Sequence, residues 1–370
     1  MLPAAKTSRF SLADVLPNCL EALAGRTGRL GLAPVSHAIV LVVDGLGRAA
    51  LESHRGHART LASRLDIDPA ISAGFPTTTA SALATLTTGE PSGQHGLVGY
   101  RVLDPATGTV VSQLSGLDAL DPATWQRMPT LFETSAADGV RSVAIGSPRH
   151  RDSGFTHAVL RGATYRAEAS IADRFASARR ELDAPGPVLV YLYVSELDVE
   201  AHARGLNSAR WVGAVESLDA EVAGLAASLG PRHGLLVTAD HGMVDVPVGG
   251  QIVVRAELLA GVRHVAGEPR CLQLHLEPGI DASVVAANWR EAEGVRAWVA
   301  TRDEAIGAGW FGRVDPEVRP RIGDVLVAAR KRYAYYADPD DSARRMVGQH
   351  GSLTPEETAI PLLRFGAFAT

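Results

Sequence analysis

The feature that most constrains the fold is a set of four apolar segments, each ending in polar residues: 38–43, 141–146, 188–194 and 234–239. Runs of this length that are apolar on both faces are typical of central strands in a parallel sheet covered by helices. Helical patterns lie between them, as at 131–137. The sequence therefore predicts an α/β fold with a doubly wound, mostly parallel sheet, whose carboxyl edge collects the polar residues.

A second constraint is the stretch 75–86, where Phe75-Pro76 leads into three threonines and then a small, apolar segment. Pro76 favours an extended approach, and the following residues predict a helix, so one threonine lies at the helix start. Unpaired N–H groups and the helix dipole stabilise a phosphate or an oxyanion there. A threonine hydroxyl becomes a nucleophile only with a base or a metal. The alternative is that residues 77–79 only cap the helix.

The sequence pattern changes from about residue 248 to 340, where short strand-like pieces alternate with turns rich in Gly and Pro and with a helical pattern near 282–293. We expect residues 1–247 and 341–370 to form a catalytic α/β core and residues 248–340 to form a small α+β cap insertion. Four aromatic residues of the cap either offer stacking surfaces to a substrate or belong to the core of the cap: Trp289, Trp298, Trp310 and Phe311.

Composition excludes several classes of function. The 370 residues carry a formal net charge of −5 and no dense basic run, so we expect no nucleic-acid polymer and no membrane as partner. Cys19 and Cys271 are far apart and form no CxxC pattern, which argues against a disulfide framework or a cysteine zinc site. The segment 1–10 has no apolar run of signal-peptide length, so we predict a cytoplasmic protein.

Six polar residues at or after strand ends could bind divalent cations: Asp44, Asp198, His202, Asp240, His241 and His350. This mixture of carboxylates and imidazoles suits zinc or another divalent transition metal better than calcium. Six ligands are too many for one tetrahedral zinc, so they divide between two ions, with Thr79 as an extra ligand. Taken singly, each has another interpretation: a chance spacing, a turn, a helix cap or a surface histidine. Their common position at one sheet edge favours the metal site.

The motifs as a set resemble the alkaline phosphatase superfamily, and within it the type I phosphodiesterase/nucleotide pyrophosphatase family. The resemblance spans nearly the whole chain and is carried by residues 42–45, 75–79, 88–89 with 95–96, Asp198 with His202, 239–243 and 349–351. It implies one zinc held by Asp198, His202 and His350. It implies a second zinc held by Asp44, Asp240, His241 and the nucleophile, which the motif places at Thr79.

One position departs from the family pattern. Nucleotide pyrophosphatases have a phosphoryl-binding asparagine some twenty residues after the nucleophile, and the equivalent place here is Tyr100. A phenol or a guanidinium can still donate to an oxyanion, so we predict Ala80 N–H, Tyr100 and Arg101 as substrate-binding groups. Residues 149–151, Arg-His-Arg, are a compact basic cluster after a strand. They either steer a phosphate or form a solvated loop.

We therefore predict a di-zinc hydrolase that cleaves phosphodiester or pyrophosphate bonds of a small phosphorylated substrate, for which a nucleotide is one candidate. The expected route is a phospho-threonine intermediate with retention at phosphorus overall. A phosphomonoesterase or a phosphonate hydrolase on the same metal core is the alternative. A phosphomutase, or a metal-binding protein without turnover, is less favoured. The sequence leaves the oligomeric state and the metal used in the cell open.

Overall fold

The main lobe is built on a seven-stranded sheet with the order β2-β17-β8-β1-β7-β5-β6. The computed structural model describes residues 2–3 and 8–369. Strands β1, β7, β8, β5 and β6 run parallel, and β17 pairs antiparallel with β8 and with β2. The strands are β1 (His37–Val43), β2 (Ala70–Ser72), β5 (Arg141–Gly146), β6 (Thr164–Ala167), β7 (Val188–Val194), β8 (His233–Thr238) and β17 (Ala359–Gly366).

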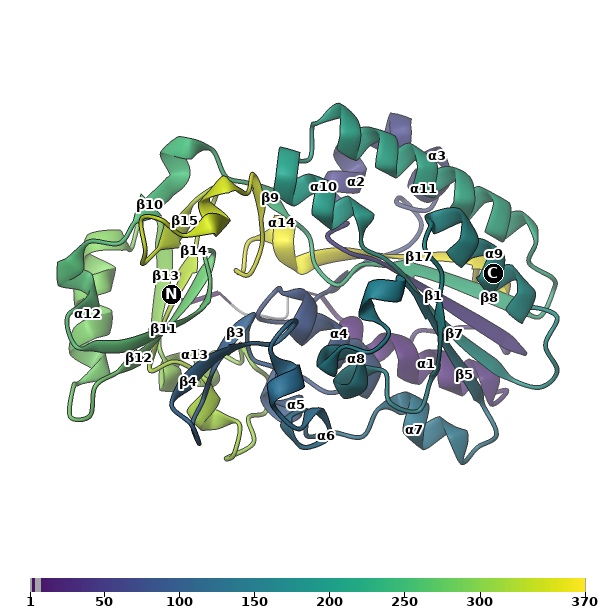
Figure 1. Ribbon diagram of the computed structural model, residues 1–370. Coiled ribbons are helices and arrows are strands. Elements are labelled where there is room, and N and C mark those ends of the chain that lie inside the picture. The colour runs from purple at the N-terminus through teal and green to yellow at the C-terminus, as the bar shows by residue number, and fades with distance from the viewer. Residues whose placement is uncertain (1, 4–7, 370) are drawn as a thin grey trace.

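Helices cover both faces of this sheet (Figure 1). One face carries α1 (Val15–Leu23), α4 (Thr79–Thr88), α7 (Leu131–Ala136) and α8 (Gly154–Val159). The other carries α3 (Arg59–Ala62), α9 (Ile171–Glu181), α10 (Glu196–Arg204) and α11 (Ala209–Ala227), with α2 (Arg48–Ser53) alongside. Every residue of β1 is buried, as expected for a strand covered on both sides. The predicted doubly wound, mostly parallel sheet is confirmed.

The second lobe, at the left of Figure 1, contains a six-stranded sheet with the order β13-β14-β12-β11-β3-β4. Its strands are β3 (Arg101–Asp104), β4 (Thr109–Ser112), β11 (Val262–Glu268), β12 (Cys271–Leu276), β13 (Ala297–Thr301) and β14 (Val325–Ala329). Helices α12 (Ala282–Glu293) and α13 (Arg302–Gly307) accompany it. The β3–β4 hairpin lies outside the segment 248–340 that we predicted as the cap, so this sheet draws strands from both parts of the sequence.

Shorter elements complete the described chain: α5 (Ser92–His95), α6 (Pro122–Trp125), α14 (Pro355–Thr358), β9 (Val244–Asp245), β10 (Gln251–Val253), β15 (Ala334–Tyr336) and β16 (Gly348–Gln349). Strand β10 pairs with β15, and β9 pairs with β16. The latter pair brings residues 348–349 beside the segment that follows β8, so the late histidine motif reaches the edge of the main sheet.

The aromatic residues of the cap are mainly core residues. Trp289 is fully buried in one cluster, and Trp310 and Phe311 are buried in another. Trp298 is partly buried, and the Arg330 guanidinium lies 5.3 Å from its ring centre. Of the two interpretations offered by the sequence, Trp289, Trp310 and Phe311 fit the one in which these side chains belong to the core of the cap.

A buried ion pair joins the two lobes. Arg270, just before β12, donates from Nε and Nη2 to the two carboxylate oxygens of Glu357 in α14, each at 2.7 Å, and both side chains are fully buried. The backbone N–H groups of Ser352 and Thr354, and the Thr354 hydroxyl, donate to the same carboxylate. Removing one partner would leave the other charge buried without compensation.

We predict that Arg270→Met lowers the free energy of unfolding by about 3–5 kcal/mol, the range for breaking a buried pair. Chemical denaturation followed by circular dichroism measures this change. Arg290→Met is the matched control, because Arg290 pairs with Glu304 at a site where both side chains are more than 40% exposed; that change should cost at most about 1 kcal/mol. Equal losses in the two variants would contradict the assignment.

Candidate metal centre and active site

The centre is built from the carboxyl ends of three neighbouring strands, β8, β1 and β7. Asp44 follows β1, Asp240 lies two residues after β8, and Asp198 lies in the first turn of α10, which begins after β7. Gly45 makes the turn after Asp44 with a φ of 72°, and a Cβ there would lie 3.2 Å from the Asp198 Oδ1 atom. The parallel sheet therefore gathers three carboxylates at one edge, as the sequence predicts.

Two groups of side chains lie close enough to hold a metal ion. In each group the ligand atoms lie within 4.8 Å of one another. The first group is Asp198, His202 and His350, and the second is Asp44, Asp198 and His241. Asp240 belongs to neither tight group, but its Oδ2 atom lies 3.6 Å from His241 Nε2. All six predicted ligands thus meet at this edge.

Backbone carbonyls fix the orientation of the three histidines. The Nδ1 atoms of His202, His241 and His350 lie 2.7, 3.1 and 2.8 Å from the carbonyl oxygens of Gly348, Gly242 and Thr77. These contacts assign the proton to Nδ1 and leave the Nε2 lone pair free. A metal-binding histidine is held in this way, with its second nitrogen donating to a carbonyl or a carboxylate.

The carboxylates carry oxygens that nothing in the described structure satisfies. Asp44 Oδ1, Asp198 Oδ1 and Asp240 Oδ2 are buried without a hydrogen-bond partner. Asp44 Oδ1 lies 3.4 Å from His241 Nε2, and Asp198 Oδ1 lies 3.4 Å from His202 Nε2, so acceptor atoms face acceptor atoms. Such a set is stabilised by cations placed between the acceptors, because buried anionic oxygens need a partner. The residues therefore fit divalent metal ions.

The electrostatics of the site follow from this crowding. Burial, and then the charges of Asp198 and Asp240, raise the pKa of Asp44 well above its usual range. Burial is also the main cause of the raised pKa of Asp198. Burial, followed by the neighbouring His241 and His202, lowers the pKa of His350, whose ring stacks on His241 with centroids 3.8 Å apart. The lowered pKa favours the neutral form of the His350 imidazole, the form that binds a metal.

Thr79 lies at the start of α4, with Thr78 as the N-cap residue. Its Oγ1 atom is 3.2 Å from His241 Nε2, so the hydroxyl lies beside the second group of ligands. The first N–H groups of a helix, here those of Thr79, Ala80 and Ser81, have no partner within the helix. The sequence prediction that a threonine and a helix start meet at the metal site agrees with this geometry.

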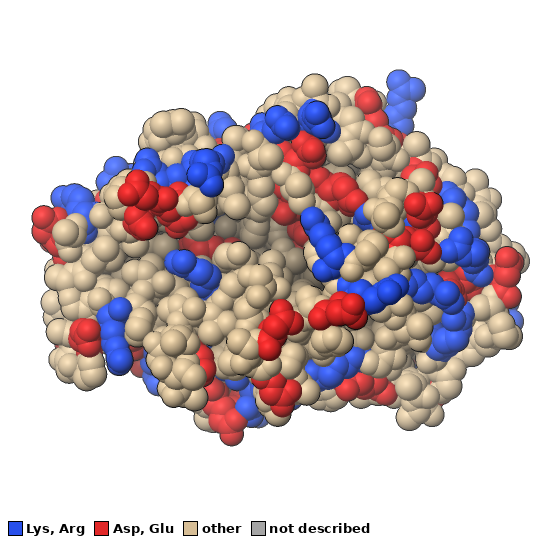
Figure 2. Space-filling model, viewed as in Figure 1, with Lys and Arg blue, Asp and Glu red and all other residues tan. Residues whose placement is uncertain are grey.

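A pocket of about 560 Å³ opens directly from the centre and includes Asp44, Thr79 and Asp198 in its wall. Figure 2 shows the molecule hollowed between its two lobes, with acidic side chains in and around the hollow. Tyr100, which is 37% exposed, lines the pocket, so it can face a bound substrate. Arg101 begins β3, is exposed, and is not part of this wall, so its predicted contact with substrate stays a prediction.

Sequence reasoning missed two residues of the site. The Tyr193 hydroxyl, near the end of β7, donates to Asp44 Oδ2. Glu268, at the end of β11, lies beside the Thr78 hydroxyl and the Tyr100 N–H, and its Oε2 is 3.6 Å from His350 Nδ1. Tyr193 could have been found from its place at a strand end. Glu268 belongs to no motif, and only the packing of the two lobes brings it to the centre.

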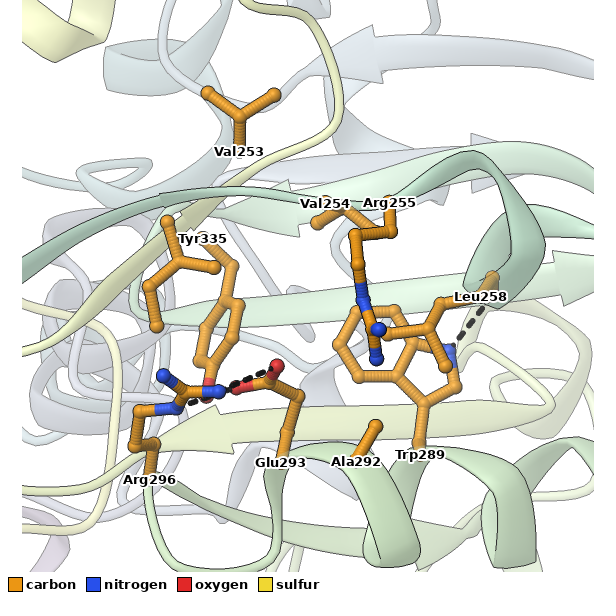
Figure 3. A pocket seen from close by; sticks show the side chains of 10 residues that line it. Val253, Val254, Arg255, Leu258, Trp289, Ala292, Glu293, Arg296 and Tyr335 are labelled. Carbon is orange, nitrogen blue, oxygen red and sulfur yellow. Dashed lines mark hydrogen bonds and ion pairs between the residues drawn. The ribbon is translucent and has the colours of Figure 1, made fainter.

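A second cavity, of about 440 Å³, lies in the cap (Figure 3). The Glu293 carboxylate there accepts from Arg296 and from the Tyr335 hydroxyl, and the Trp289 indole N–H donates to the Leu258 carbonyl. These buried polar groups are already paired, so the cavity lacks the unsatisfied atoms that mark the metal centre.

No helix in the described part of the chain combines the length and the apolar character needed to cross a lipid bilayer. The segment 1–10, on which the predicted cytoplasmic location rests, includes residues 1 and 4–7, which lie outside the described residues. That location stays a prediction.

Comparison with known proteins adds independent information. Residues 38–353 match the family model described as type I phosphodiesterase/nucleotide pyrophosphatase. No curated protein matched the sequence. Similar solved structures include phosphonoacetate hydrolase from Sinorhizobium meliloti 1021, with a TM-score of 0.71 and 19% identity over 90% of this chain and 91% of that chain. Murine ectonucleotide pyrophosphatase/phosphodiesterase 5 aligns with a TM-score of 0.67 and 19% identity over 89% of this chain and 88% of that chain. The human protein of the same name aligns with a TM-score of 0.69 and 18% identity, over 89% and 87%.

The crowded carboxylates give a prediction for the metal-free protein. The pKa of Asp44 is raised in the folded state. At pH values between the ordinary pKa of about 4 and this raised pKa, Asp44 is therefore protonated in the folded state and ionised in the unfolded state. Stability without metal should therefore fall as the pH rises through this window. Asp44→Asn removes the effect, so in chelator at pH 8 we expect the variant to unfold at a higher temperature than wild type.

With zinc, wild type should unfold at a higher temperature than Asp44→Asn, because zinc binding stabilises the folded state of wild type and the variant lacks one ligand. Thermal unfolding with chelator and with zinc measures both effects. Asp66→Asn, at an exposed aspartate paired with Arg55, is the control and should change the free energy of unfolding by no more than about 0.5 kcal/mol. The assignment of Asp44 would be refuted if Asp44→Asn unfolded at a lower temperature than wild type in chelator and if zinc raised its unfolding temperature as much as that of wild type.

Proposed function

Because the chain belongs to the type I phosphodiesterase/nucleotide pyrophosphatase family, a family of phosphoric ester hydrolases, we propose that it cleaves phosphodiester or pyrophosphate bonds through a phospho-threonine intermediate at Thr79. One observation carries the proposal: the Thr79 hydroxyl at a helix start lies 3.2 Å from His241 Nε2, within a cluster of buried, unpaired carboxylate oxygens. A nucleophile, its activating site and an anion-binding helix end therefore meet at one point.

The proposed cofactors are two Zn²⁺ ions, or other divalent transition metals, since the donors are carboxylates and neutral imidazoles. Asp198, His202 and His350 would hold one ion, and Asp44, Asp240, His241 and Thr79 would hold the other. When bound, such ions lower the pKa of a coordinated hydroxyl and offset the charge that develops on phosphoryl oxygens. The tight grouping of Asp198, His202 and His350 supports the first set.

The proposed reaction has two steps. Thr79 Oγ1 forms a bond to phosphorus while the bond between phosphorus and the leaving oxygen breaks, and the hydroxyl proton of Thr79 passes to water. The Ala80 N–H and the dipole of α4 would stabilise the negative charge on the nonbridging oxygens, and Tyr100, which lines the pocket, is proposed to donate from its hydroxyl as well. Water then breaks the bond between Thr79 and phosphorus and restores the hydroxyl. Two inversions give retention at phosphorus overall.

The solved neighbours support a small phosphorylated substrate. One is an inactive variant of murine ectonucleotide pyrophosphatase/phosphodiesterase 5, in which alanine replaces a threonine, in complex with AMP. Another is phosphonoacetate hydrolase in complex with phosphonoacetate. A nucleotide is therefore one candidate substrate for this chain, and a phosphonate on the same metal core is the second. A phosphomonoester is the third alternative.

Turnover of bis(4-nitrophenyl) phosphate and of 4-nitrophenyl phosphate, with zinc and with chelator, tests the function. We expect zinc-dependent release of nitrophenol with the diester as the better substrate. A preference for the monoester would favour the phosphomonoesterase alternative. Absence of zinc-dependent turnover of either ester, together with hydrolysis of phosphonoacetate, would favour the phosphonate hydrolase.

We predict that Thr79→Ala reduces kcat for the diester by at least about 10³-fold, because it removes the nucleophile. The zinc content, measured by inductively coupled plasma mass spectrometry, should change little, because the aspartate and histidine ligands remain. Thr87→Ala is the matched control on the same helix: Thr87 is buried, its hydroxyl donates to the Leu83 carbonyl, and it does not line the pocket. Wild-type turnover in a pure Thr79→Ala preparation would rule out the intermediate.

A further inference from the structure

The pocket beside the candidate metal centre has both apolar side chains and a guanidinium in its wall. Leu83 of α4, Ile145 of β5 and Phe155 of α8 supply apolar surface. Arg149 and His150, in the short turn after β5, line the same pocket. A ligand whose phosphoryl group lies at Thr79 would therefore place an apolar group along this wall.

Arg149 is held in place by neutral partners. Its Nη2 atom donates to Ser195 Oγ at 3.2 Å, and its Nε atom donates to His150 Nε2 at 3.0 Å. No carboxylate in the described part of the chain forms an ion pair with it, whereas most arginines nearby are paired, such as Arg174 with Glu196. A positioned guanidinium with donors left over is suited to a bidentate contact with a carboxylate or a phosphate.

Two aromatic side chains link Arg149 to the candidate metal centre. The Tyr193 hydroxyl donates to Asp44, and the His150 ring lies edge-on to the Tyr193 ring with centroids 6.3 Å apart. The guanidinium, which donates to His150, is therefore connected to the Asp44 carboxylate through these two side chains. Burial, and then the charge of Arg149, lower the pKa of His150, so at neutral pH this ring accepts the hydrogen bond from Arg149.

Resting on the hydrolase function proposed above, we propose that Arg149 binds a second anion of the substrate. The preferred substrates are then phosphoryl compounds whose apolar organic group carries a carboxylate or a phosphate at its far end. Besides Asp44 and Asp198, a third carboxylate, that of Asp118, lines the pocket, and its Oδ1 accepts from the Gly154 N–H at 2.6 Å. It therefore has a partner of its own at the start of α8.

Three diesters with the same leaving group test this inference: 4-nitrophenyl phenyl phosphate and its analogues with a carboxylate or a phosphate at the far end of the phenyl ring. We expect wild type to favour the acidic diesters in kcat/KM. Arg149→Gln should lower that preference by about tenfold or more, mainly through KM, as expected for loss of a charge-assisted hydrogen bond. Arg149→Lys should restore part of it.

Arg151→Gln is the control, because this substitution removes the same charge two residues away, and Arg151 does not line the pocket. It should keep the preference of wild type. The two acidic diesters show whether carboxylate or phosphate is the better ligand. An unchanged preference in Arg149→Gln, or an equal loss in Arg151→Gln, would overturn the inference. An equal loss of kcat for all three diesters in Arg149→Gln would overturn it as well, by placing the guanidinium on the transferred phosphoryl group.

Binding provides a measurement without turnover. Calorimetry of zinc-loaded Thr79→Ala protein with phenyl phosphate and with 4-carboxyphenyl phosphate should show tighter binding of the carboxylated ligand, and adding Arg149→Gln should remove the difference. If wild type hydrolyses none of the diesters while this difference persists, the proposed reaction fails but the anion site stands. Equal binding of both ligands to the Thr79→Ala protein would overturn the anion site.

Discussion

The structure depends on the enforced proximity of three buried carboxylates. The sheet order places β8, β1 and β7 side by side, so Asp240, Asp44 and Asp198 meet at one edge. Each has an oxygen without a hydrogen-bond partner, and burial is the main reason that the pKa values of Asp44 and Asp198 are raised. Like charges out of water oppose folding unless cations accompany them. The fold therefore has a built-in requirement for positive charge at this place.

The surrounding elements are arranged to meet that requirement and to use it. Three backbone carbonyls orient the histidines so that their free nitrogens face the carboxylates. Helix α4 brings the Thr79 hydroxyl and unpaired N–H groups to the same point. The second lobe contributes Glu268, and the Arg270–Glu357 pair fixes its position against the main lobe. The pocket that includes Asp44, Thr79 and Asp198 also has Arg149 in its wall, where we propose that part of the substrate binds.

Much of this arrangement could be predicted from sequence, and the reasons are physical. Continuous apolar runs predict buried parallel strands, and the carboxyl ends of such strands must share an edge, so Asp44, Asp198 and Asp240 could be grouped before any coordinates were known. The spacing of Asp198 and His202 predicted that both lie on one helix face, and in the structure Asp198 Oδ1 lies 3.4 Å from His202 Nε2. The resemblance to a family added the nucleophilic role that we propose for Thr79.

The rest depended on contacts between distant segments, which periodicity does not encode. Nothing in the sequence around Glu268, at the end of β11, indicates that this residue reaches His350. The β3–β4 hairpin joins a sheet whose other strands come from residues 262–329. Arg149 belongs to a basic cluster for which the sequence favours a solvated loop. Two features distinguish it from Arg151: its hydrogen bonds to Ser195 and His150, and its place in the pocket wall.

The most direct test of the account is the number and position of metal ions in crystals of the zinc-loaded protein, measured by anomalous scattering at the zinc edge. The account predicts two peaks, one among Asp198, His202 and His350, and the other among Asp44, Asp240, His241 and Thr79. No peak at this edge of the sheet, or zinc bound only elsewhere, would contradict it.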